Sequence, residues 1–92
     1  MATGEVQINN GTFRVTKWTI EPNDAIPLHL HEFQYVVVPL TAGTMIVTSH
    51  DGAVSATELE FGNCYSRASG AKHTVANSGS HRIVFMEIEK LD

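Results

Sequence analysis

Three histidines carry the clearest chemistry in this sequence. His29 and His31 stand two residues apart in a segment, 28–40, that is rich in Val, Phe and Tyr and is therefore predicted to be a strand. Side chains two residues apart in a strand lie on one face, so both imidazoles can turn toward one metal ion at about 2 Å per bond. His73 comes much later in the chain, and a second strand would have to bring it alongside. The spacing predicts a mononuclear metal centre inside a small β-barrel.

The elements that must position these histidines are strands. Turn signals separate runs rich in β-branched and aromatic residues, at Asn10-Gly11, Thr41-Ala42-Gly43, Asp51-Gly52, Gly62-Asn63 and Ser78-Gly79-Ser80. The runs predict strands at 5–9, 12–20, 28–40 with a break or bulge, 44–49, 53–59, 64–67, 72–77 and 81–89. Glu21–Pro27, with two prolines, is predicted to be a loop. Short strands at regular spacing favour a single all-β domain spanning residues 1–92, a sandwich or barrel.

Composition excludes several functional classes. The net charge is −4 and the six Lys and Arg residues are scattered, so no basic stripe is present to bind nucleic acid. The longest apolar run, Val36–Leu40, is too short to span a membrane, and the N-terminus has no secretory pattern. Cys64 is the only cysteine, so no internal disulfide can form. We expect a cytoplasmic protein that binds small molecules.

Two motifs resemble those of a known family, the cupins. Residues 62–77 match the pattern G-x5-P-x-G-x2-H-x3-N at every fixed position except the proline, which is Ala68 here. Within residues 23–43, the pattern G-x5-H-x-H-x3–4-E-x6-G is matched by both histidines and the closing Gly43, with Asn23 at the opening glycine. The resemblance implies a double-stranded β-helix, the jelly-roll barrel of the cupins.

The resemblance also implies metal ligands at His29, His31 and His73. The family's fourth ligand, a glutamate, would fall at Val36 when counted back from Gly43. Strict strand alternation instead places Tyr35 on the histidine face. Neither residue is a carboxylate, and Glu32 should point away from the site unless a bulge re-aims it.

Three neutral imidazoles leave the metal's full +2 charge uncompensated. Such a site favours an anionic or chelating small molecule, such as a carboxylate, an enolate or a thiolate. Three facial ligands leave positions open, where Fe(II) can bind substrate and O₂ together. The three-histidine site resembles those of cysteine dioxygenases and β-diketone-cleaving dioxygenases, so an Fe(II) dioxygenase is the favoured function. Zn, Ni, Cu or Mn would fit the same ligands.

Two alternatives to an enzyme stay open. A stand-alone cupin could bind a metal or small molecule as a sensor or carrier, and a metal-free structural barrel is the third interpretation. Acid–base catalysis is disfavoured, because the ten carboxylates are predicted to lie mostly at strand ends and turns.

Other polar residues have less certain roles. Tyr35 could line the pocket, ligate the metal or simply pack in the core. Gln34 could orient a ligand through its amide if the strand bulges there. Cys64 is predicted to be a small buried side chain in preference to a ligand or nucleophile. His50 and His81 flank hairpin turns and should be solvated.

Two segments are apolar on both faces, namely 35–38 and 83–86. Such strands need a covering layer on each side, from another sheet or another subunit, so we expect a homodimer. Residues suited to the barrel core are Trp18, Phe33, Met45, Val47, Phe61 and Phe85.

Overall fold

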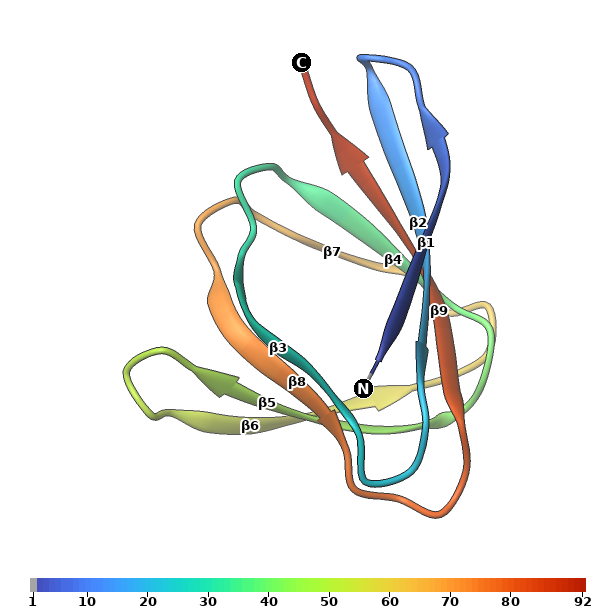
Figure 1. Cartoon of the computed structure of the whole chain (residues 1–92), viewed down its shortest axis with the longest axis vertical. Helices are drawn as coiled ribbons and strands as arrows, with labels where there is room; N and C mark the ends of the chain where they lie inside the picture. The colour runs from blue at the N-terminus through green and yellow to red at the C-terminus, as the bar shows by residue number, and fades with distance from the viewer. Residues whose placement is uncertain (1) are drawn as a thin grey trace.

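The computed structural model describes residues 2–92, which form nine strands and no helix (Figure 1). The strands are β1 (Thr3–Asn9), β2 (Phe13–Ile20), β3 (Ala25–Leu30), β4 (Tyr35–Pro39), β5 (Gly43–Ser49), β6 (Val54–Leu59), β7 (Tyr65–Arg67), β8 (Lys72–Asn77) and β9 (Ile83–Lys90). Within this part of the chain, nothing helical is long and apolar enough to cross a membrane. The all-β prediction is confirmed.

The strands form two antiparallel sheets that enclose the core. The five-stranded sheet has the order β1-β2-β9-β4-β7, and the four-stranded sheet has the order β3-β8-β5-β6. Strands that are distant in sequence pair in both sheets, as β2 does with β9 and β3 with β8. Figure 1 shows the two sheets opening away from each other at one end and converging at the other. This is the jelly-roll arrangement that the motifs imply.

Burial alternates along the strands, and the inward residues form the core. In β9 the inward positions are Ile83, Phe85, Glu87 and Glu89, all buried, while the residues between them are only partly buried. Burying each large aliphatic or aromatic side chain contributes about 1.5–3 kcal/mol. The core residues are Ile20, Ile26, Tyr35, Val37, Met45, Leu59, Val75, Ile83 and Phe85.

Two sequence predictions about the core and loops are wrong. Glu21–Pro27 is not wholly a loop, because β3 begins at Ala25 and pairs with β8. Pro27 is tolerated since β3 is an edge strand, and the register shifts between Ile26 and His29. Phe61 is 75% exposed because it lies at the turn after β6 rather than on an inward strand position.

The predicted break in 28–40 is confirmed, since β3 ends at Leu30 and β4 begins at Tyr35. Asn23, which replaces the motif's opening glycine, has φ 65°. Asparagine is one of the few residues that adopt this left-handed conformation readily, so the departure from the motif keeps its backbone geometry. The Asn23 N–H donates to the Asn77 carbonyl at 2.8 Å.

Asn77, the last motif position, locks the end of the barrel. It is almost fully buried, and its Nδ2 donates to the carbonyls of Ile20 at 2.9 Å and His81 at 2.7 Å. Its Oδ1 accepts the Gly79 N–H at 3.0 Å. These hydrogen bonds fix the turn that follows β8.

Candidate metal centre

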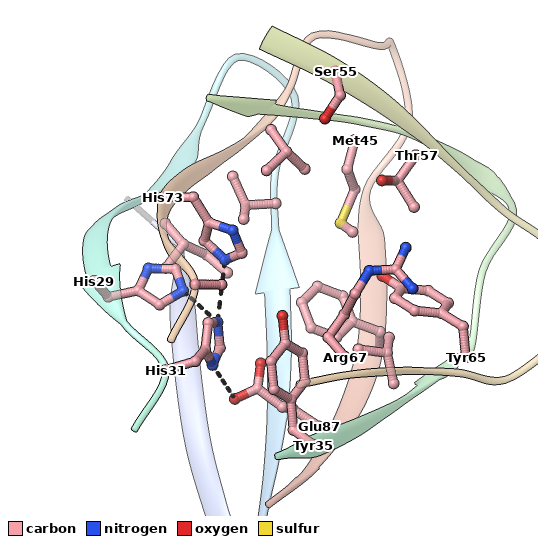
Figure 2. Close-up of a pocket in the computed structure, with 16 residues that line it drawn as sticks. His29, His31, Tyr35, Met45, Ser55, Thr57, Tyr65, Arg67, His73 and Glu87 are labelled. Atoms are coloured by element: carbon pink, nitrogen blue, oxygen red, sulfur yellow. Dashed lines mark hydrogen bonds and ion pairs between the residues drawn. The ribbon is translucent and has the colours of Figure 1, made fainter. Parts of the chain in front are cut away.

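The two paired strands β3 and β8 bring the three histidines together. His29 and His73 are direct register partners across the β3–β8 ladder, and His31 follows the end of β3. His31 stays on the ladder's path because its N–H donates to Ala71 O at 2.8 Å. The Nε2 atom of His31 lies 2.9 Å from Nε2 of His29 and 3.1 Å from Nε2 of His73 (Figure 2).

The remaining ring nitrogens explain why the Nε2 atoms point inward. His29 Nδ1 is 2.7 Å from the carbonyl oxygen of Pro27, which can only accept a hydrogen bond, so Nδ1 is the protonated nitrogen. His31 Nδ1 faces Glu87 Oε1 at 3.9 Å. With its proton on Nδ1, the His29 ring turns the lone pair of Nε2 toward His31. Outer partners of this kind commonly orient metal-ligating histidines.

Electrostatics keep His31 and His73 neutral at physiological pH. Burial, followed by the proximity of His29 and His73, lowers the pKa of His31 from 6.5 to about 4. Burial and His29 also lower the pKa of His73. Because the neutral imidazole is the form that ligates metals, these two side chains can bind a metal ion without first losing protons.

The spacing of the donor atoms fits a metal ion. Three ligands at right angles, with metal–nitrogen bonds of about 2.1 Å, have nitrogen atoms about 3.0 Å apart, whereas tetrahedral angles give about 3.4 Å. The separations of 2.9 and 3.1 Å, both measured from Nε2 of His31, match pairs of ligands at right angles. All three ligating atoms lie within 4.8 Å of one another.

The cluster opens into a cavity of about 240 Å³ between the two sheets. The wall near the histidines includes Tyr35 and Glu87, and the opposite wall includes Met45, Ser55, Thr57, Tyr65 and Arg67 (Figure 2). Most of the other lining residues are apolar, namely Ile26, Val37, Val47, Ala71, Val75 and Phe85. A small molecule in this space would contact both the histidines and the far wall.

Tyr35 lies on the histidine face, as strand alternation predicts. Its ring stacks on His31, with centroids 4.1 Å apart and planes at 21°, and the side chain is buried. Burial raises the pKa of its hydroxyl to about 12, so the group stays neutral. The alternative position for the missing glutamate, Val36, is partly exposed on the outer face of the sheet, and that alternative is wrong.

A buried carboxylate, Glu87, is the functional residue that sequence reasoning missed. Its relative exposure is 8%, and it lines the cavity beside His31. Burial and the neighbouring Glu89 raise the pKa of Glu87 to about 7, while Arg14 opposes the rise. The carboxylates were predicted to lie mostly at strand ends and turns, and Glu87 is an exception that faces the interior. The sequence pattern that could have identified Glu87 is the alternation Ile83, Phe85, Glu87, which places this acid on the inward face of β9.

Glu89, the next inward acid, is neutralised by an arginine. Arg14 Nε and Nη2 donate to the two carboxylate oxygens of Glu89, each at 2.8 Å. This bidentate pair satisfies the Glu89 charge within the protein. Glu87 has no such partner among the described residues and is the inward carboxylate left at the cavity.

The other candidates lie away from the cavity. Gln34 and Cys64 are both exposed and do not line it, and Cys64 Sγ is 3.8 Å from the Gly62 carbonyl. The expectation that Cys64 is buried is wrong, because it precedes the short edge strand β7. Glu32 is exposed, as expected of a side chain that points away from the site. His50 and His81 are exposed, which confirms that prediction.

Comparison with known proteins identifies the family. The chain is 39% identical over 88 residues to the "Beta-alanine degradation protein BauB" of Pseudomonas aeruginosa, a match that covers 96% of this chain and 92% of that protein. A cupin domain from Bordetella pertussis Tohama I is 36% identical, with a TM-score of 0.92 over 97% of this chain and 92% of that one. No protein-family model matches the sequence.

A structure with much lower sequence identity has the same fold. An RmlC-like cupin from Methanocaldococcus jannaschii, with a double-stranded β-helix fold, has a TM-score of 0.80 at 16% identity, covering 98% of this chain and 80% of that one. The chain belongs to the cupin family. Its fold is the RmlC-like double-stranded β-helix, and its small single domain carries a cluster of three histidines.

Proposed function

We propose that this cupin binds one divalent metal ion through His29, His31 and His73 and acts as a metal-dependent enzyme on a small molecule. The favoured reaction is that of an Fe(II) dioxygenase on a small chelating substrate. The observation that carries the proposal is the convergence of three Nε2 atoms at one end of a cavity, with Nε2 of His31 lying 2.9 and 3.1 Å from the other two.

Fe(II) held by three facial nitrogens supplies open positions for substrate and O₂ together. Zn, Ni, Cu and Mn fit the same donors, so the imidazoles alone do not select iron. An anionic or chelating substrate is favoured because three neutral ligands leave the ion's charge uncompensated.

The chain's own residues would orient the ligands and the substrate. The carbonyl of Pro27 holds the His29 ring, while the Tyr35 ring packs flat against His31. The apolar middle of the cavity excludes water from the reacting atoms. Glu87 lies beside His31, and its carboxyl group can accept or return a proton on a substrate bound in the cavity.

The Pseudomonas relative supports a small-molecule role. Its name assigns it to the degradation of β-alanine. A role in the breakdown of a small metabolite suits a cavity of about 240 Å³ in this chain. The name carries no information on O₂ chemistry, and the dioxygenase rests on the histidine set.

The test is O₂ consumption by anaerobically iron-loaded protein across a panel of small diketones, thiols and keto acids. Consumption with at least one class, absent from His73→Ala, supports the dioxygenase. Silence across the panel with retained ligand binding would overturn it and favour the second candidate, a cupin that binds a metal or ligand as sensor or carrier. That candidate is favoured because the described residues 2–92 form strands and short connections, and no element among them is suited to be a lid.

A homodimer and a cytoplasmic location are part of the proposal. The outer face of the five-stranded sheet carries partly exposed apolar side chains from neighbouring strands, including Val36 on β4 and Ile88 on β9. Such a face is suited to a second subunit. Sedimentation equilibrium of the purified protein tests the dimer, and a monomer at micromolar concentration would refute it.

A further inference from the structure

Arg67 differs from the other two arginines because it has no carboxylate partner among the described residues. Arg14 is paired with Glu89, and Arg82 Nε lies 3.0 and 2.9 Å from the two oxygens of Glu21. Arg67 instead donates a single hydrogen bond from Nη1 to the Ser66 carbonyl, at 3.0 Å. Most of the five N–H donors of its guanidinium are therefore left for a ligand or for water.

The sheet register places Arg67 on the same inner face as the metal site. Arg67 on β7 pairs with Tyr35 on β4, and Tyr35 pairs in turn with Glu89 on β9. The next inward row joins Tyr65, Val37 and Glu87 in the same way. Arg67 therefore ends a cross-strand row whose next member, Tyr35, stacks on His31.

The guanidinium is held at the cavity by an aromatic ring. Its central carbon lies 4.5 Å from the centroid of the Tyr65 ring, within the range of a cation–π contact. Both residues line the cavity that contains the histidines, and Figure 2 shows them on the side opposite His29 and His73. The unpaired cation thus lies across the cavity from the cluster.

The size and charge of the cavity narrow the class of ligand. Its volume of about 240 Å³ lies below the roughly 300–1,000 Å³ of sites that hold drug-sized ligands, which favours a small ligand. One end faces the nitrogen donors of the histidines, and the other faces a permanent positive charge. Glu87 also lines this space, but it lies beside His31 rather than in an ion pair with Arg67.

We propose that Arg67 anchors a carboxylate of the substrate, whose other end chelates the metal held by the three histidines. The substrate class is then a short-chain acid with a metal-binding oxygen group at the far end. This inference rests on the proposed metal site. The guanidinium fork matches a carboxylate in two parallel hydrogen bonds, which sets both the specificity and the orientation of the substrate.

The test uses a matched pair of metal-binding probes on zinc-loaded protein, where no turnover occurs. Acetohydroxamic acid carries only the chelating group, whereas succinic acid monohydroxamate adds a carboxylate at the far end. Isothermal titration calorimetry gives the dissociation constant of each probe. Because Arg67 is exposed, we expect a moderate effect. The wild type should bind succinic acid monohydroxamate with a dissociation constant about tenfold lower than that of acetohydroxamic acid, which corresponds to about 1.4 kcal/mol.

Substitutions separate the anchor from the metal site. Arg67→Gln should reduce the preference to less than threefold while leaving the affinity for acetohydroxamic acid unchanged, and Arg67→Lys should retain part of the preference. Arg82→Gln is the matched control, because Arg82 is exposed, paired with Glu21 and absent from the cavity wall; it should keep the full preference.

The outcomes distinguish the two proposals. Equal affinity of wild type for both probes, or a preference that survives Arg67→Gln, overturns the role of Arg67 and leaves the metal site intact. Failure of both probes to bind zinc-loaded wild type overturns the metal site, and the anchor with it.

Discussion

Glu87 and His31 make opposite contributions to the pH dependence of stability. Replacing one residue should therefore reveal the pH dependence that the other contributes. Both side chains are buried, and their nearest titratable atoms are 3.9 Å apart. The pKa of Glu87 is raised from 4.5 to about 7, mainly by burial, and that of His31 is lowered from 6.5 to about 4, also mainly by burial. The perturbation is Glu87→Gln, which keeps the size of the side chain and removes its titration.

The sign of each contribution follows from which state binds the proton more tightly. The folded state binds the Glu87 proton more tightly, so the stability that Glu87 contributes is complete below pH 4.5 and is lost as the pH rises through 7. The unfolded state binds the His31 proton more tightly, so the stability that His31 contributes is complete above pH 6.5 and is lost as the pH falls toward 4. Each effect amounts to about 2 kcal/mol between pH 4.5 and 6.5, at 1.36 kcal/mol per pKa unit. The two slopes oppose each other in the wild type, and His73, whose pKa is also lowered, adds to the slope of His31.

The assay is urea denaturation of the metal-free, EDTA-treated protein at pH 4.5, 5.5 and 6.5. Over this range we expect the free energy of unfolding of Glu87→Gln to rise by about 2 kcal/mol more than that of the wild type. For His31→Gln it should rise by about 2 kcal/mol less than that of the wild type. Glu32→Gln, an exposed glutamate on the neighbouring loop, is the matched control and should follow the wild type. Parallel profiles for wild type and Glu87→Gln would refute the reasoning.

Substitutions at three further positions test the site and the packing of the barrel. His73→Ala should abolish stoichiometric metal binding while the barrel still folds, and metal retained by the purified variant would refute the three-histidine site. Tyr35→Ala should lower the free energy of unfolding by about 3 kcal/mol, against less than about 1 kcal/mol for Tyr35→Phe, because the ring and not the hydroxyl packs on His31; equal losses in urea denaturation would contradict this. Gly4→Ala should destabilise by about 1–3 kcal/mol, since its Cβ would lie 2.8 Å from the Trp18 ring, and an unchanged melting temperature would show that the ring moves aside.

The fold and the histidine cluster could be predicted because local patterns encode them. Turn residues punctuate the strands, and two histidines at a spacing of two share a strand face whatever the partner strand. The substitution of Asn23 for glycine was harmless to the motif, since both residues tolerate the φ of 65° found there.

The chemistry of the cavity depended on pairings that the sequence does not reveal. Glu87 and Glu89 occupy equivalent inward positions on β9, yet only Glu89 is neutralised, because β2 places Arg14 opposite it. The location of Arg67 at the cavity likewise depends on the pairing of β7 with β4. Cys64 was misjudged for a related reason, as burial near a short edge strand is decided by neighbours distant in sequence.

The most direct test of the central claim is the metal content of untagged protein after anaerobic reconstitution with Fe(II), counted per chain by elemental analysis. The account predicts one ion per chain in the wild type and none above background in His73→Ala. Wild-type protein that retains no metal, under conditions where it remains folded, would contradict the claim that His29, His31 and His73 form a metal centre.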